Sequence, residues 1–134
     1  MIGAIIITHG KLGEVLVGTA EAIAGKMENV RCLSIDACDS AKCISDGISA
    51  AMKTMNCKAG IIILTDMFGG TPSNIGLSFL EPGKVEILTG VNLPMLLKFA
   101  SHRADKGLSE LAALLKEYGQ KSIVLASAVL KEKG

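Results

Sequence analysis

The sequence predicts a single α/β domain in three layers, with helices on both faces of a mainly parallel sheet of about five strands. The chain has 134 residues, enough for one domain with its own hydrophobic core. Runs of branched aliphatic residues also alternate with segments of helical periodicity, as in βαβ units. We therefore expect residues 1–134 to form one domain.

Five runs have the character of strands. The first and third are uninterrupted aliphatic runs, which is typical of strands buried on both faces of a parallel sheet. The last run has no helical pattern after it, so the sequence leaves its direction and its partner open. The predicted strands are Ile2–Thr8, Val30–Ile35, Ala59–Thr65, Val85–Thr89 and Ser122–Ala128.

Helical periodicity fills the segments between these strands. The first apolar helix face comprises Leu16, Ala20, Ile23, Ala24 and Met27. The second comprises Ile44, Ile48, Ala51, Met52 and Met55. Further helices are predicted to begin near Pro72 and near Pro94, and to cover Leu108–Tyr118.

Composition excludes several classes of function. No apolar run approaches the roughly 18 residues of a membrane span, and MIGAIIITHG lacks the basic start and cleavage site of a signal peptide. We therefore expect a cytoplasmic protein that does not insert into the membrane. The net charge is +1 and only 3% of residues are aromatic, so a nucleic-acid surface is not expected.

The cysteines predict no special chemistry. The spacings of Cys32, Cys38, Cys43 and Cys57 match no CxxC or zinc-ribbon pattern. Cys32, Cys43 and Cys57 lie in or beside apolar stretches, as small core residues do. We expect free thiols, in keeping with a cytoplasmic location, and neither a metal nor a cofactor.

Two polar residues directly follow buried strands. His9 follows the first strand and Asp66 the third, at the sheet edge where open α/β proteins bind ligands. Gly10 leaves the chain free to turn and the imidazole uncovered. If these strands are neighbours, Asp66 can accept a hydrogen bond from one ring nitrogen and leave the other to attack, as in serine-protease triads. The alternatives are a structural histidine and a turn or cap aspartate.

A glycine-rich turn follows Asp66. Thr71 and Pro72 suit an N-cap and a first helical residue, and Gly69 and Gly70 allow close backbone approach. A helix N-terminus of this kind suits a phosphate group. Walker A and GxGxxG motifs are absent, which favours a phosphoryl group that arrives on a protein.

Other readings of the histidines are less favoured. A serine hydrolase would need a GxSxG elbow, and a receiver domain would need acidic residues after the first strand. The chain has neither feature. His102 lies near a predicted helix C-terminus, where a cation suits the helix dipole, so we expect it to be structural.

Three motifs together resemble a known family. THG, TDMFGGTPSN and GVNLPML, after the first, third and fourth strands, resemble the IIA component of the mannose/fructose/sorbose family of the bacterial sugar phosphotransferase system (PTS). The resemblance covers essentially the whole chain. It implies that His9 is phosphorylated, through Nε2, and that Asp66 is its hydrogen-bonding partner.

The resemblance also predicts the surroundings of His9. Gly69, Gly70 and Thr71 would hold the phosphoryl group. Related proteins often carry Trp at the position of Phe68, so the surface offered to partners differs there. The expected rim of the site, where partners make contact, comprises Thr8, Gly10, Met67, Phe68, Pro72 and Asn92.

The resemblance implies an assembly and a pathway as well. The sheet would have four parallel strands and one antiparallel strand, the last exchanged across a homodimer. The donor would be the phosphocarrier protein HPr and the acceptor a separate IIB protein, with membrane IIC and IID proteins downstream. The alternatives are a regulatory module read by a binding partner and the phosphoryl-donor subunit of dihydroxyacetone kinase.

Overall fold

A parallel sheet runs through the centre of the molecule. The computed structural model describes residues 1–38, 40–67, 74 and 76–133. Within these residues four strands pair in the order β2-β1-β3-β4. They are β1 (Gly3–Thr8), β2 (Val30–Ser34), β3 (Ile61–Thr65) and β4 (Val85–Thr89). Four of the predicted strands are thereby confirmed, although the third begins at Ile61 instead of Ala59.

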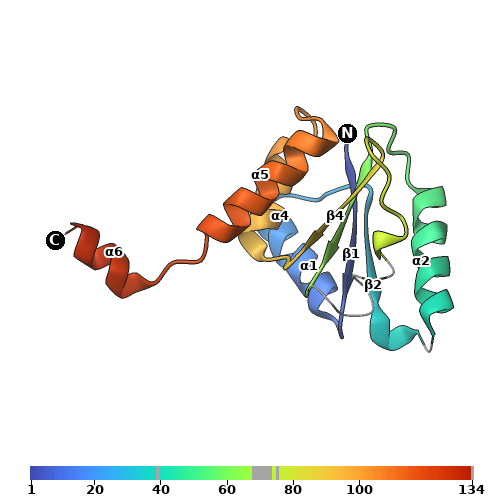
Figure 1. Cartoon of the computed structure of the whole chain (residues 1–134), viewed down its shortest axis with the longest axis horizontal. Coiled ribbons are helices and arrows are strands. Elements are labelled where there is room, and N and C mark those ends of the chain that lie inside the picture. Colours follow the sequence, from blue (N-terminus) through green and yellow to red (C-terminus); the bar gives the residue numbers. More distant parts are fainter. Residues whose placement is uncertain (39, 68–73, 75, 134) are drawn as a thin grey trace.

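Helices cover both faces of this sheet, which confirms the three-layer prediction. The helices α1 (Leu12–Ala24), α4 (Leu93–His102) and α5 (Leu108–Lys121) lie on one face, and α2 (Ala41–Thr54) lies on the other (Figure 1). The 3-10 turn η1 (Ile35–Ala37) joins β2 to α2. Asn74 is helical, but the expected helix start at Pro72 lies outside the described residues. None of the helices within the described ranges has the length and apolarity to cross a membrane.

The side chains of β1 alternate between the two layers of core. Ala4 and Ile6 pack with α1, α4 and α5, whereas Ile5 and Ile7 pack with α2. All four are fully buried. Burying one large aliphatic side chain stabilises the fold by about 1.5–3 kcal/mol, so a continuous aliphatic strand stabilises both layers.

The apolar face of α1 differs from the predicted one. The helix buries Gly13, Val17 and Ala20, whereas Ile23 is 62% exposed and Met27 is buried in the loop beyond the helix. A Cβ atom at Gly13 would lie only 3.0 Å from Cγ2 of Ile6. The close approach at this glycine sets the rotation of the helix on the sheet, and an apolar pattern that ignores glycine misses it. On α2 the predicted positions Ile44, Ile48 and Ala51 are buried, as expected.

The fifth predicted strand does not form in the single chain. Residues 122–125 are not in a strand, and a helix, α6 (Ala126–Lys133), projects from the body of the molecule (Figure 1). A strand needs a neighbour to satisfy its backbone groups, and the described part of this chain gives the segment none. Ile123, Val124 and Leu125 are 81%, 62% and 71% exposed. Exchange of this segment across a dimer stays a prediction.

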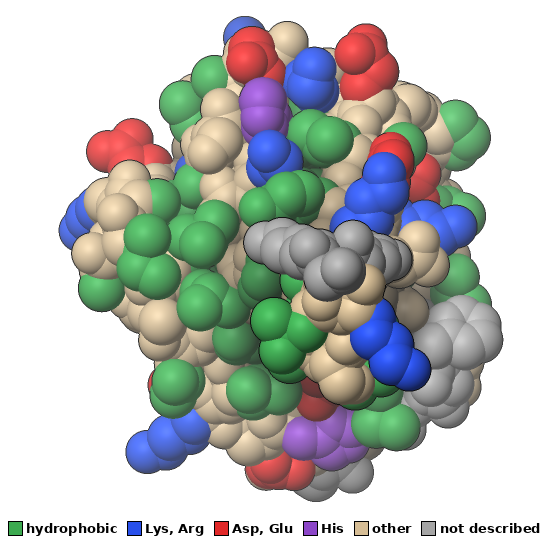
Figure 2. Space-filling model, turned by 90° about the vertical axis from the view of Figure 1, so that its left-hand side faces the viewer, with side chains coloured by type: hydrophobic (Ala, Val, Ile, Leu, Met, Phe, Trp, Pro, Cys, Tyr) green, Lys and Arg blue, Asp and Glu red, His purple; other side chains and the backbone are tan. Residues whose placement is uncertain are grey.

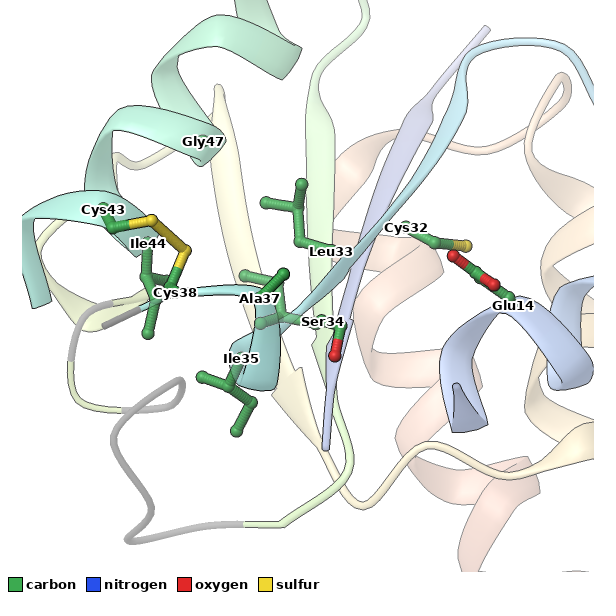
Figure 3. A pocket seen from close by; sticks show the side chains of 11 residues that line it. Glu14, Cys32, Leu33, Ser34, Ile35, Ala37, Cys38, Cys43, Ile44 and Gly47 are labelled. Atoms are coloured by element: carbon green, nitrogen blue, oxygen red, sulfur yellow. A yellow bond between two sulfur atoms is a disulfide. The ribbon is translucent and has the colours of Figure 1, made fainter. Parts of the chain in front are cut away.

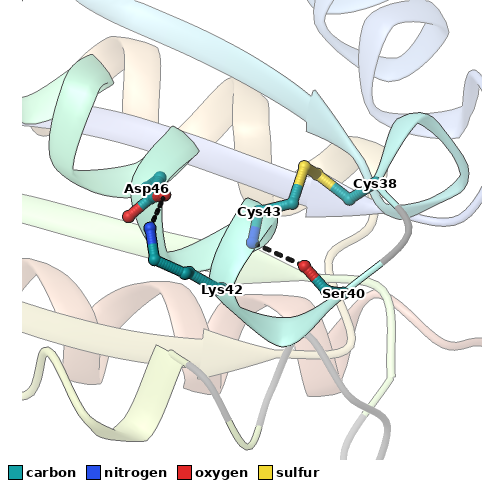
Figure 4. The surroundings of a disulfide bond; sticks show 5 residues. All are labelled: Cys38, Ser40, Lys42, Cys43 and Asp46. Atoms are coloured by element: carbon teal, nitrogen blue, oxygen red, sulfur yellow. Dashed lines mark hydrogen bonds and ion pairs between the residues drawn. A yellow bond between two sulfur atoms is a disulfide. The ribbon is translucent and has the colours of Figure 1, made fainter.

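The prediction of four free thiols is also wrong. Cys38 and Cys43 form a disulfide, with their Cα atoms 5.4 Å apart, while Cys32 and Cys57 are free (Figure 4). Cys38 directly follows η1, and Cys43 lies in the first turn of α2. The turn into the helix brings the two sulfur atoms together, although the spacing matches no recognised motif.

Candidate functional site

His9 and Asp66 meet at the carboxyl edge of the sheet. Their strands, β1 and β3, are direct neighbours, with Ile7 paired to Thr65. The chain leaves β1 toward β2 on one side and returns to β3 on the other, so helices diverge at this point. Open parallel sheets form their binding crevice at such a switch in strand order. The expected meeting of these two side chains is confirmed.

One oxygen atom of Asp66 holds both the backbone and the ring of His9. Oδ2 lies 2.9 Å from the ring Nδ1 and accepts the backbone N–H of His9 at 3.0 Å. A carboxylate at this distance favours the tautomer with its proton on Nδ1. The lone pair is then on Nε2, in a side chain that is 52% exposed. The arrangement therefore prepares Nε2 as a nucleophile.

The charge of Asp66 is stabilised by the same contacts. Its side chain is only 12% exposed, and burial by itself raises the pKa of a carboxyl group. Hydrogen bonds from the backbone and the ring of His9 oppose this effect and leave the pKa of Asp66 below its ordinary value. Asp66 is therefore a carboxylate at neutral pH and can balance positive charge on the imidazole.

A second carboxylate, which the sequence analysis missed, supports the His9 loop. Asp36 Oδ2 accepts the backbone N–H of Gly10 at 2.6 Å. Gly10 has φ of +54°, a conformation that favours glycine. Consecutive amides of the loop are thus held by aspartates that follow β3 and β2. Asp36 follows its strand much as Asp66 does, so the same strand-end rule would have found it.

The rim residues predicted from the sequence lie in different surroundings. Gly10 is exposed, and Met67 is 53% exposed. Thr8 is buried, and its Oγ1 accepts the Gly13 N–H at 2.8 Å, so it supports α1 instead of facing a partner.

Asn92 has a structural role. Its Oδ1 caps α4 by accepting the Met95 N–H at 3.0 Å, and its Nδ2 donates to the Gly119 carbonyl at 3.2 Å. Any contact between Asn92 and a partner stays a prediction.

The predicted phosphoryl-binding turn lies outside the described residues. Gly69, Gly70 and Thr71, with the rim residues Phe68 and Pro72, therefore stay predictions. Within the described ranges, no group of three His, Cys, Asp or Glu side chains is arranged to hold a metal ion.

A shallow groove leads from His9 toward α2. It has a volume of about 400 Å³. Its lining residues are His9, Ile35, Asp36, Cys38, Ser40, Ala41 and Ile44. Three large apolar side chains are exposed on the loop before Phe68 and at the start of α1: Met67, Leu12 and Val15, which are 53%, 46% and 62% exposed.

Comparison with known proteins places the chain in a family. Residues 3–116 match the family described as PTS system fructose IIA component. The chain is 31% identical over 134 residues to the PTS system mannose-specific EIIAB component of Escherichia coli K12, covering 98% of this chain but 42% of that relative. It therefore spans less than half the length of that protein. The PTS system fructose-specific EIIA component of Bacillus subtilis is 30% identical, with 98% of this chain and 91% of the relative covered.

Solved structures agree with this assignment. The EIIA component from Streptococcus agalactiae superposes with a TM-score of 0.85 at 26% identity, covering 96% of this chain and 99% of that one. The mannose/sorbose-specific IIA subunit from Enterococcus faecalis gives 0.81 at 25% identity, with 92% of each chain covered. The sequence match, the relative of similar length and the shared fold show that this chain belongs to the PTS IIA components of the mannose, fructose and sorbose type.

Proposed function

We propose that this chain is a phosphocarrier in which His9 accepts a phosphoryl group from phospho-HPr and passes it to a IIB protein for sugar uptake and phosphorylation. The observation that carries the proposal is the contact of 2.9 Å between His9 Nδ1 and Asp66 Oδ2, because it favours a proton on Nδ1 and so leaves the Nε2 lone pair for attack. Membership of the PTS IIA family supports the same role.

The transfer step follows from this geometry. The Nε2 lone pair attacks the phosphorus atom in line, an N–P bond to His9 forms, and the N–P bond in the donor phosphohistidine breaks. The donor ring keeps the electron pair of the broken bond, while His9 becomes an imidazolium whose Nδ1 proton faces Asp66. Catalysis of this kind consists of positioning and electrostatic stabilisation. Gly69, Gly70 and Thr71 are proposed to hold the equatorial oxygens through amides and a hydroxyl.

The surface near His9 supports a protein as donor. Leu12 and Val15 are exposed on the first turns of α1, and the Leu12 N–H donates to the His9 carbonyl at 3.4 Å. Exposed apolar side chains around a polar centre are typical of a protein interaction site. A small metabolite would instead favour a deep, enclosed pocket.

We also propose that the protein acts as a homodimer held by its C-terminal segment. Figure 2 shows the side of the molecule from which α6 projects, where hydrophobic side chains cover much of the surface. Ile123, Val124, Leu125 and Leu130 are all more than 60% exposed. Burial of this segment against a second copy would remove that apolar area from water.

The decisive experiment is phosphorylation followed by a chase. The protein is incubated with HPr, enzyme I and labelled phosphoenolpyruvate, and then mixed with IIB proteins from the same organism. Label should appear as one acid-labile phosphohistidine on the His9 peptide and then move to one IIB protein. His9→Ala should remain unlabelled, and the matched control His102→Ala should be labelled normally. Label on His102, or label that no IIB protein removes, would contradict the proposal.

A further inference from the structure

One end of the disulfide between Cys38 and Cys43 lies in the wall of the His9 groove. Cys38 lines that groove together with His9, Asp36 and Ser40. The bond joins the end of η1 to the first turn of α2, where the Ser40 hydroxyl accepts the Cys43 N–H at 3.2 Å (Figure 4). The separation of 5.4 Å between the Cα atoms is within the range of about 4.4–6.8 Å that a disulfide spans.

Cys38 and Cys43 are partly exposed, and both line a cavity. Both cysteines are only half-buried. A second cavity, of about 270 Å³, is lined by Cys38 and Cys43 together with Leu33, Ile44 and Gly47 (Figure 3). A small thiolate can therefore reach these two residues, and the cavity leaves space beside them when the bond opens.

A short covalent path leads from the disulfide to His9. Cys38 is two residues from Asp36, and its N–H donates to the Ile35 carbonyl at 3.0 Å, which closes η1. Asp36 in turn holds the N–H of Gly10, the residue next to His9, at 2.6 Å. The disulfide thus fixes the turn that carries one of the two carboxylates of the His9 loop.

The two remaining cysteines are poor candidates for exchange. Burial, with smaller contributions from Glu14 and Glu21, raises the pKa of the Cys32 thiol to about 11. Burial also raises the pKa of Cys57. Thiol–disulfide exchange requires a thiolate, so both should remain thiols while Cys38 and Cys43 react.

We propose that Cys38 and Cys43 form a reversible thiol–disulfide site that sets the rate at which His9 accepts a phosphoryl group. This inference rests on the proposed phosphocarrier function. With the bond closed, η1 is held and Asp36 stays on Gly10. With the bond open, η1 gains freedom, Asp36 leaves Gly10 part of the time, and loading of His9 slows several-fold without being lost.

The exchange chemistry balances with a low-molecular-weight disulfide as oxidant. The Cys43 thiolate attacks one sulfur of the oxidant, which forms a mixed disulfide and releases one thiolate. The Cys38 thiolate then attacks the Cys43 sulfur and releases the second thiolate. Two electrons pass from the cysteines to the oxidant, and the two released thiolates take up the two protons. A dithiol reductant reverses both steps.

The first part of the test measures which cysteines exchange. The intact protein is equilibrated in mixtures of reduced and oxidised dithiothreitol, its thiols are alkylated, and each cysteine is read by mass spectrometry. Cys38 and Cys43 should oxidise together at a defined ratio while Cys32 and Cys57 remain alkylated. The proposal is overturned if Cys38 and Cys43 remain thiols at every ratio.

The second part measures loading of His9 by rapid quench from labelled phospho-HPr. Oxidised protein should load several-fold faster than reduced protein, and re-oxidation should restore the rate. Cys43→Ser should load at the slow rate in both buffers, whereas the matched control Cys57→Ser should keep the redox response. Asp36→Ala should load slowly in both redox states, because the connection to Gly10 is removed.

The outcomes separate this inference from the proposed function. Loading at equal rates in both redox states, or a redox response that survives in Asp36→Ala, would overturn the switch. Failure of His9 to load in either state would refute the phosphocarrier role itself, and the inference with it.

Discussion

The substitution Asp66→Asn should separate the effect of the Asp66 charge on loading of His9 from the effect of its hydrogen bonds. A single oxygen, Oδ2, accepts both the ring contact at 2.9 Å and the backbone N–H at 3.0 Å. An asparagine carbonyl oxygen at the same place can accept both bonds, so the variant keeps the geometry and loses the charge. Asp66→Ala loses both.

The contacts of Asp66 set the loss of loading rate that we expect for each variant. A charge-assisted hydrogen bond exceeds a neutral one by about 1–1.5 kcal/mol, and this gain is realised as His9 becomes cationic during transfer. The His9 side chain is 52% exposed, and screening by solvent favours the lower end, ~1 kcal/mol. Asp66→Asn should therefore load about fivefold more slowly, and Asp66→Ala, at ~2 kcal/mol, about thirtyfold more slowly.

The assay is single-turnover rapid quench with labelled phospho-HPr, with circular dichroism to establish that each variant is folded. Another His–Asp contact, between His102 and Asp105 at 3.4 Å, provides a matched control. Asp105→Asn should load at the wild-type rate. Wild-type loading by Asp66→Asn would show that the carboxylate charge is not used. Equal rates for Asp66→Asn and Asp66→Ala would show that hydrogen-bond geometry alone is responsible.

Three further predictions concern acid stability, assembly and helix packing. The pKa of Asp66 is lowered by folding, so its contribution to stability exists above the ordinary value near 3.9 and is lost as the pH falls through the lower folded value. The Tm difference between wild type and Asp66→Asn should accordingly shrink below about pH 4, and a constant difference would contradict this assignment. Sedimentation velocity at micromolar concentration should show a dimer that Leu125→Asp dissociates, and a wild-type monomer would refute the proposed assembly. Gly13→Val should reduce the free energy of unfolding by about 1–3 kcal/mol, because the added side chain overpacks against Ile6. Gly18→Ala, at an exposed helix position with open space around it, should instead raise the free energy of unfolding by about 0.5–1 kcal/mol. Equal Tm values for the two variants would exclude close packing at Gly13.

The sequence predicts the sheet and its chemistry better than it predicts the loops and the end of the chain. Aliphatic runs identify buried strands because burial on both faces leaves no polar position, and strand ends then locate His9 and Asp66 together. Asp36 also follows a strand, but its carboxylate binds the backbone amide of Gly10, and no side chain in the sequence marks such a contact. The disulfide was missed because it depends on how one turn enters α2, and no spacing rule encodes that geometry.

The C-terminal segment shows a second reason why a structure can differ from the one that its sequence predicts. Ile123 and Val124 are β-branched and Leu125 is apolar, as is typical of a strand, yet all three are exposed and irregular in the single chain. Strand formation depends on a pairing partner as much as on residue type. The sequence of an apolar segment therefore does not specify which residues will cover it.

The paired aspartates that hold the His9 loop also bear on phosphoryl-transfer potential. In the proposed function, His9 would carry a dianionic group near Asp36, whose carboxylate binds the Gly10 amide, while Asp66 faces the ring Nδ1. Repulsion between the phosphoryl group and the Asp36 carboxylate would raise the free energy of the loaded state relative to that of an acceptor without such a neighbour. Each 1.4 kcal/mol shifts the exchange equilibrium about tenfold toward the acceptor. The contact of Asp36 with the His9 loop would thus also make the phosphorylated protein a ready donor, a property that a storage form of phosphate would not need.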